Sequence, residues 1–271
     1  MTDISFKATK IKRKLRLGVF VWKKLTKNPK SKTAVISDLF PVRNDKNWST
    51  EFELLNVSGL ISGDNNQNKP SISAFYFFDH NGIVLGVRNI EMQNKGRKTI
   101  KFKDFLANDL IDAKTFAVFH SSIDEDLEFN GSYLAERGYT GYEYNNLGVK
   151  GYVHGNLDAV ALVNNKVKPL GNSGLLQRYY TVQHCLRGPA KYEFIFTNPT
   201  SKKAKIRPYI AFNPNKWEKQ KNFEISPLGL NVFNLEIEDG QKCYVKFRSG
   251  LYLARPVVFR ISNDSMDVFH G

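Results

Sequence analysis

Cysteine is scarce in this sequence. The 271 residues include only Cys185 and Cys243, which allows at most one disulfide bond and excludes a disulfide-rich secreted scaffold. So sparse a count is typical of a reducing compartment, and we therefore expect free thiols. The N-terminal region lacks a long apolar stretch and a small-residue cleavage site, which argues against a secretory signal. A cytoplasmic location is the expectation.

Long hydrophobic runs are also missing. No segment approaches the ~20 apolar residues of a membrane span, and nothing shows the alternation of strands and long helices that a parallel sheet needs. The five histidines form no close pair with metal-ligand spacing. His184 and Cys185 are adjacent, so in a strand they would point to opposite faces. Nucleophile elbows and phosphate-binding loops are absent too. We expect no metal ion and no cofactor.

Positive charge is present, and it is concentrated at the N-terminus. Residues 1–32 contain eleven Lys or Arg and one acid, Asp3, and so carry most of the net charge of +14. Apolar residues recur there at helical spacing, from Ile11 to Leu25. This favours a basic amphipathic helix, although the strand formers between residues 15 and 22 leave a strand as the alternative.

An amphipathic basic segment can lie in a membrane interface, with its apolar side buried and its cations on anionic lipid. We expect residues 1–32 to bind an anionic membrane surface at the inner membrane face. The residues that would make this contact are Lys10, Lys12, Arg13, Lys14, Arg16, Trp22, Lys23 and Lys24. Docking on the protein's own sandwich, a partner protein and the phosphates of nucleic acid are the alternatives.

Beyond residue 32, short runs of β-branched and aromatic residues alternate with clusters of Gly, Asn, Asp and Pro. This rhythm predicts an all-β chain with antiparallel, jelly-roll-like sandwiches. The expected strands of the first half span residues 33–36, 50–56, 71–78, 83–87, 97–102, 115–120, 131–135, 141–144 and 151–153. Those of the second half span residues 158–163, 177–184, 192–197, 206–212, 222–225, 231–237, 242–247, 251–254, 257–261 and 267–270.

The two halves of the chain resemble each other. The segment that ends in His154-Gly155 is similar to the C-terminal His270-Gly271, 116 positions later. At nearly the same offset, residues 74–79 resemble residues 191–197. Further matches join 116–121 to 243–249 and 133–137 to 252–256. A period of this size is a domain. The sequence thus predicts a basic extension (1–32) followed by two tandem β-sandwich domains related by duplication (33–154 and 155–271).

His154 and His270 are the candidate site residues that this repeat singles out. Histidine titrates near neutral pH, and the following glycine allows close approach of backbone or ligand. Asp158 and Asp267 lie near enough in the sequence to orient the two imidazoles. The alternative is that each histidine closes its sandwich by a hydrogen bond to the backbone, because duplication copies structural contacts as well as functional ones.

Tyrosines gather between the two halves. Exposed tyrosine rings beside a charged pair suit a sugar, whose ring stacks on aromatic faces while its hydroxyls need polar partners. The predicted ligand-binding residues are Arg137, Tyr139, Tyr142, Glu143, His154 and His270. The alternative is that these are ordinary strand tyrosines at the contact between domains.

The first half also carries a similarity to a known family. Trp48-Ser-Thr-Glu51, then Leu55-Asn56, then the strand at residues 74–79 with its aromatic pair and final acid resemble the small β-sandwich family of sensory-rhodopsin transducers. The similarity covers residues 33–120 and is less clear in the second half. It implies a cytoplasmic sandwich that assembles into homo-oligomers and acts by binding.

The sequence therefore predicts a non-enzymatic binding or scaffold protein that recognises a carbohydrate and associates peripherally with the membrane. One alternative is an enzyme that acts on a glycan or small molecule, with His154 and His270 as general acid and base. The other is a nucleic-acid-binding protein that uses the basic leader.

Overall fold

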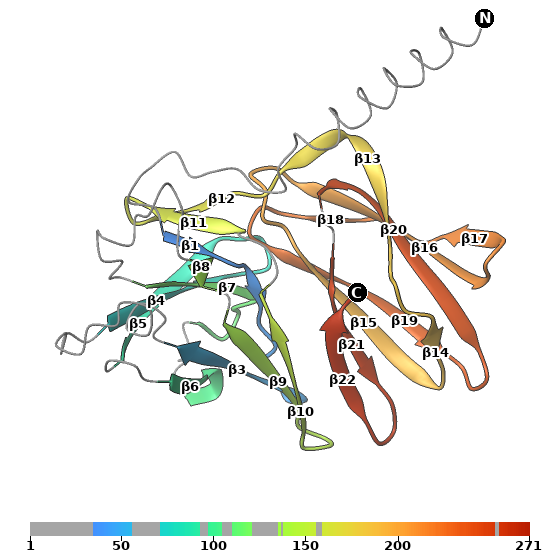
Figure 1. Ribbon diagram of the computed structural model, residues 1–271, viewed down its shortest axis with the longest axis horizontal. Coiled ribbons are helices and arrows are strands. Elements are labelled where there is room, and N and C mark those ends of the chain that lie inside the picture. Colours follow the sequence, from blue (N-terminus) through green and yellow to red (C-terminus); the bar gives the residue numbers. More distant parts are fainter. Residues whose placement is uncertain are drawn as a thin grey trace, which may run out of the picture.

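The chain is all-β, as the alternating sequence pattern predicts. The computed structural model describes residues 35–55, 71–92, 97–104, 110–120, 135–136, 138–155, 159–252 and 255–271. Within these ranges its longest helix is a short 3₁₀ helix, η1 (Phe102–Asp104). The described strands form five sheets. Figure 1 shows the first half of the chain beside the second, with the C-terminus near their border.

Two four-stranded sheets enclose the core of the first half. Side chains alternate across each strand, so that Phe52, Phe75 and Phe116 all point into the same layer, where their rings meet edge-on or stacked at centroid distances of 5.5–6.2 Å. One sheet has the order β10 (Val149–His154), β9 (Tyr139–Tyr144), β3 (Trp48–Leu55) and β6 (Arg97–Lys101). The other has the order β2 (Phe40–Pro41), β7 (Thr115–His120), β4 (Ser71–Phe78) and β5 (Val84–Met92).

Two sheets enclose a second core in the C-terminal half, where Phe194, Phe196 and Phe247 are fully or almost fully buried. One sheet has the order β19 (Leu230–Ile237), β15 (Ala190–Thr197), β21 (Val257–Ile261) and β22 (Met266–His270). The other has the order β13 (Ser173–Thr181), β20 (Lys242–Leu251), β16 (Ala204–Asn213) and β17 (Lys216–Lys219). In this sheet β14 (Leu186–Arg187) also pairs with β20, and β18 (Phe223–Ile225) pairs with β16.

A fifth, smaller sheet joins the start of the described chain to its middle. Its order is β12 (Lys166–Pro169), β11 (Val160–Val163), β1 (Val35–Ser37) and β8 (Ala135–Glu136). The β11–β12 hairpin follows the domain boundary predicted at residues 154 and 155, yet it pairs with β1 and lies with the first half in Figure 1. The division into domains 33–154 and 155–271 stays a prediction.

The strand orders of the two halves correspond. Sheet β10-β9-β3-β6 has the same order as β22-β21-β15-β19, and β2-β7-β4-β5 has the same order as β13-β20-β16-β17. β15 thus takes the place of β3, and β16 takes the place of β4. The sequence match between residues 74–79 and 191–197 is therefore wrong in register, because it aligns β4 with β15. The two histidines do correspond: His154 pairs with Tyr139 on β9, and His270 pairs with Val257 on β21.

The halves are packed against each other. The rings of Trp48 and Tyr142 meet the ring of Phe259 edge-on, at centroid distances of 4.9 and 5.0 Å. Elsewhere along the border, the Thr115 hydroxyl donates a hydrogen bond of 2.6 Å to the Leu228 carbonyl. These buried contacts fix the two halves relative to each other.

Most of the predicted strands are present, with boundaries that differ by a few residues. Four strands were not predicted: β2, β12, β14 and β17. β12 and β17 were missed because Lys166-Val-Lys-Pro169 and Lys216-Trp-Glu-Lys219 are rich in lysine and lie at sheet edges, where no face is deeply buried. A signal for β12 was present in Asn164-Asn165, both at positive φ, which form the turn of a two-residue hairpin. The strand predicted at residues 251–254 is wrong in part, since Leu251 ends β20. Residues 1–32 lie outside the described residues.

Candidate functional site

The two repeated histidines meet at the border between the halves. β10 and β22 lie side by side (Figure 1), and the rings of His154 and His270 are 5.2 Å apart between centroids. Nε2 of His270 is 2.8 Å from the backbone carbonyl of His154. Because a carbonyl oxygen only accepts, this nitrogen carries the hydrogen. The sequence predicted two equivalent histidines, and the fold brings them together in one place.

His154 is exposed and has one ring nitrogen committed to the backbone. Its Nδ1 lies 2.5 Å from the carbonyl oxygen of Gly155, which leaves Nε2 as its outward-facing atom. The ring of Tyr139 flanks it at 6.3 Å. Gly155 itself must be small, because a Cβ there would lie 1.8 Å from Oδ2 of Asp38. The group that comes close to this glycine is therefore a side-chain carboxylate, whereas the sequence predicted backbone or a ligand.

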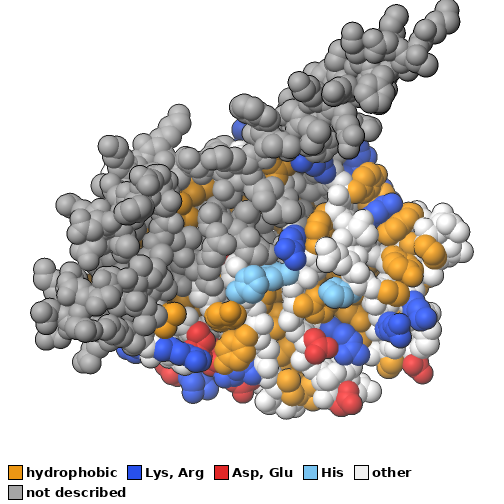
Figure 2. Space-filling view, viewed as in Figure 1, with side chains coloured by type: hydrophobic (Ala, Val, Ile, Leu, Met, Phe, Trp, Pro, Cys, Tyr) orange, Lys and Arg blue, Asp and Glu red, His pale blue; other side chains and the backbone are white. Residues whose placement is uncertain are grey.

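A cavity of about 60 Å³ adjoins both histidines. This volume holds a few water molecules or one edge of a small polar ligand. Histidine side chains lie near the middle of the face in Figure 2, next to Lys or Arg side chains. The polar and aromatic side chains that line the cavity come from five strands and their flanking loops: Asp38, Phe40, Tyr142, His154, Phe196, Thr197, Arg255 and His270.

Burial controls the protonation of His270. Loss of solvent lowers its pKa below the ordinary 6.5, and the nearby His154 and Arg255 lower it further, against the opposing effect of the hydrogen bond to the His154 carbonyl. The imidazole of His270 is consequently neutral at neutral pH. Asp267 does not orient it, because the carboxylate of Asp267 pairs with Arg260 at 3.1 Å. Asp158 lies outside the described residues.

The predicted tyrosine cluster is divided by the fold. Tyr139 is 56% exposed and stands beside His154. Tyr142 is fully buried, and its hydroxyl donates a hydrogen bond of 2.8 Å to the Pro41 carbonyl, so only part of its ring lines the cavity. Burial also raises the pKa of this hydroxyl. The prediction that Tyr142 is an exposed stacking residue is therefore wrong. Arg137 lies outside the described residues.

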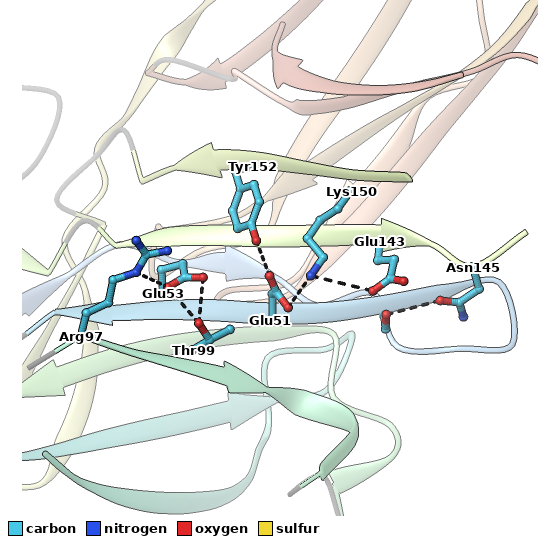
Figure 3. A network of polar contacts seen from close by, with 9 residues as sticks. Glu51, Glu53, Arg97, Thr99, Glu143, Asn145, Lys150 and Tyr152 are labelled. Atoms are coloured by element: carbon cyan, nitrogen blue, oxygen red, sulfur yellow. Dashed lines mark hydrogen bonds and ion pairs between the residues drawn. The ribbon is translucent and has the colours of Figure 1, made fainter. Parts of the chain in front are cut away.

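Glu143 belongs to a different cluster, which Figure 3 shows on the sheet of β3, β6, β9 and β10. It lies 3.9 Å from the Lys150 ammonium, and this ammonium also pairs with Glu51 at 2.8 Å. The hydroxyl of Tyr152 donates to Glu51 as well, and burial together with this bond raises the pKa of Tyr152. The prediction that Glu143 joins the histidines at one site is not supported by this arrangement.

Glu53 is the second buried acid of this cluster. It accepts hydrogen bonds from Arg97 at 2.7 Å and from Thr99 at 3.0 Å (Figure 3), and Arg97 holds its pKa below the ordinary value. Sequence reasoning missed the pair of glutamates as a cluster. The signal was Glu51-Phe-Glu53, which puts two acids on one face of a strand whose other face is core. Both carboxylates are satisfied by partners, so the cluster is a structural network.

Other chemistry is not apparent in the described part of the chain. There, no group of three His, Cys, Asp or Glu side chains could hold a metal ion. Cys185 and Cys243 are free thiols, and burial raises the pKa of Cys243. The described residues include no helix that is long and apolar enough to cross a membrane. In comparisons with known proteins, no family model and no curated protein sequence matches this chain.

Proposed function

We propose that this protein is a non-enzymatic binding protein that recognises a carbohydrate at the cavity between its two halves. The observation that carries the proposal is the meeting of His154 and His270, which come from corresponding strands, beside a polar cavity. A site at the junction of two packed units is a common position for a ligand pocket.

The groups around the cavity suit a sugar. The Arg255 guanidinium is a donor, the Asp38 carboxylate is an acceptor, and the Thr197 hydroxyl can act as either. The exposed ring of Tyr139 beside His154 offers an apolar surface for the C–H face of a sugar ring. Sugar hydroxyls need this mixture of donors, acceptors and a flat ring.

Acid–base catalysis by the histidine pair has less support. Nε2 of His270 is held as a donor to a backbone carbonyl, and Nδ1 of His154 also lies against one. Each ring thus has one nitrogen committed to the backbone. A general acid and base acting together would need an open nitrogen on each ring.

Ligand-observed NMR against neutral and acidic mono- and disaccharides tests the proposal. At least one sugar should give saturation transfer from the protein, and His154→Gln and Arg255→Gln should each remove the signal. His184→Gln is the matched control, because His184 is exposed, packs on the ring of Phe269 and does not line the cavity. Loss of signal in the control alone, or no binding by any sugar, would refute the assignment. Turnover of a sugar during the titration would favour the enzyme alternative.

We also propose that the two sandwiches descend from one duplicated domain. The support is the common strand order of both pairs of sheets and the corresponding register of His154 and His270. Superposition of β10-β9-β3-β6 on β22-β21-β15-β19 should bring the two histidine Cα atoms together. A better superposition with β3 on β13 would count against common ancestry, and with it against the resemblance to the transducer family as an explanation of both halves.

For residues 1–32 we propose contact with anionic membrane lipid. The support is the density of Lys and Arg in the sequence together with its apolar spacing. The full chain should pellet with vesicles that contain anionic lipid and not with neutral ones. A variant with Lys10, Lys12, Lys23 and Lys24 changed to Gln should remain in the supernatant. Equal pelleting on both kinds of vesicle would exclude the charge-based contact.

A further inference from the structure

A second charged surface lies on the other side of the C-terminal sandwich. Strand β20 alternates strictly: Val245 and Phe247 point into the core, and Lys246 and Arg248 therefore point outward. The cavity at the histidines lies against the opposite sheet, where Ile195 and Val257 line it. The core of this sandwich thus separates the two surfaces.

Cations and aromatic rings are interleaved on this outer face. In register with Arg248 are Tyr179 on β13 and Arg207 on β16, and in register with Lys246 is Tyr209. The face also includes Trp217 on the edge strand β17. The Lys246 ammonium lies 3.8 Å from the Trp217 ring centroid, and 5.1 and 5.7 Å from the centroids of Tyr179 and Tyr209. The rings stabilise the positive charges without neutralising them.

In the part of the chain that the structure describes, no acidic side chain pairs with the cations of this face. Arg207 lies directly opposite Arg248, and like charges in that position destabilise a sheet. Nε of each arginine is buried without a hydrogen-bond partner. Within the described residues no acid is within ion-pair distance of Arg207, Arg248 or Lys246. Of the acids on this sheet, Glu218 lies 3.8 Å from Lys216, and Glu224 is in register with Lys205. The basic leader has the same sign and would not supply the charge.

We propose that this face binds the carboxylate or sulfate groups of an acidic polysaccharide. Two guanidinium groups side by side match the planar or tetrahedral oxyanions that arginine binds in a forked geometry. The ring of Tyr179 lies 5.6 Å from the Arg248 guanidinium and 5.8 Å from the ring of Tyr209, and the hydroxyls of both can serve sugar hydroxyls. Single-stranded nucleic acid needs open ring faces on which bases stack, and here Lys246 covers the Trp217 ring. This site is independent of the cavity at the histidines.

Binding of the full chain to immobilised polymers tests this inference. The probes are dextran sulfate, alginate, neutral dextran and single-stranded poly(dT). The test variant carries Arg207→Gln and Arg248→Gln. The matched control carries Lys202→Gln and Lys203→Gln, which remove the same charge from an exposed turn between β15 and β16. Both variants keep the leader, so its charge contributes equally.

Dextran sulfate and alginate should bind the wild type and the control, and the arginine variant should bind them about tenfold more weakly or worse. Neutral dextran should not bind. Equal affinities for the arginine variant and the control would overturn the proposal, and so would preferential, arginine-dependent binding of poly(dT), which would make the face a nucleic-acid surface. Should the glutamine variant fail to fold, Arg207→Lys with Arg248→Lys keeps the charge, and it should still weaken binding because the forked contacts are lost. His154→Gln should leave polymer binding unchanged, which separates this site from the cavity.

Discussion

An ion pair between the two halves gives the sharpest stability prediction. Arg43 pairs with Glu193 across the border, and its guanidinium carbon lies 4.0 Å from the Trp48 ring centroid and 5.1 Å from that of Phe259. The side chains of Arg43 and Glu193 are only 16% and 8% exposed. Burial disfavours the charge of Glu193, but Arg43 and Lys191 outweigh it and hold the pKa below the ordinary value.

Arg43→Met removes the charge and keeps the apolar stem. Removing one partner of a buried pair costs about 3–5 kcal/mol, and the lost cation–π contact adds up to ~2 kcal/mol. The Lys191 ammonium still lies 2.7 Å from Glu193 in this variant and is 44% exposed, so it compensates part of the negative charge of Glu193. We therefore expect a loss of about 3 kcal/mol in the free energy of unfolding. Glu193→Gln should cost about 2 kcal/mol, and the double variant less than the sum, with a coupling of about 1–3 kcal/mol.

Urea denaturation followed by tryptophan fluorescence measures this coupling, because Trp48 lies in the contact. The control cycle uses Arg260→Met and Asp267→Asn, a pair at 3.1 Å whose side chains are 32% and 58% exposed. Its coupling should stay below about 1 kcal/mol. A coupling for Arg43 and Glu193 no larger than that of the control would refute the reasoning.

The pH dependence gives an independent check on the same pair. The folded pKa of Glu193 is below 4.5, so its stabilising effect is present above that pH and is lost as pH falls through the lowered value. In Arg43→Met the largest favourable charge is gone and burial raises the carboxyl pKa relative to the wild type, so the folded pKa of Glu193 approaches or exceeds its unfolded value and the loss of stability in acid should become smaller. An unchanged acid profile for the variant would contradict the assigned role of Arg43.

Three further predictions concern packing and protonation. Gly151→Ala should destabilise the fold by about 1–3 kcal/mol, seen as a lower melting temperature, because its Cβ would lie 2.5 Å from Cγ1 of Val268 between β10 and β22; an unchanged melting temperature would show that this contact yields. Phe247→Ala should cost about 3–5 kcal/mol in urea denaturation, since its ring is fully buried in the C-terminal core. His270 has a lowered pKa, so the unfolded chain binds more protons than the folded one below about pH 6.5, and the free energy of unfolding should fall there with decreasing pH. His270→Asn should flatten this slope between pH 6.5 and 5. An identical slope in the variant would show that other groups cause it.

Local alternation was enough to predict the strands that have one buried face. The side chains of β20 alternate: those of Cys243, Val245 and Phe247 point inward, and that of Lys246 points outward. This period of two is visible in the sequence. The same rule could not reveal edge strands, because β17 buries neither face and its lysines hide the pattern. Contacts across the border were out of reach for a different reason. Arg43 and Glu193 are 150 positions apart, and no local pattern encodes their meeting.

Residues in equivalent structural positions of the two halves are not separated by a constant number of residues. His154 and His270 correspond in register and are 116 positions apart. Glu51 and Glu193 also correspond, because each is followed by a buried phenylalanine on the strand that pairs with β9 or β21, yet they are farther apart than the histidines. The chain between β3 and β9 is longer than that between β15 and β21, so one offset cannot align both pairs. The fixed offset was correct for the histidines on β10 and β22, differed by two positions from the register of β9 and β21, and was wrong at β4. The hydrogen-bond register defines positions within a sheet whatever the length of the loops. It therefore identifies the residues that occupy equivalent positions in the two halves, which a constant sequence offset does not.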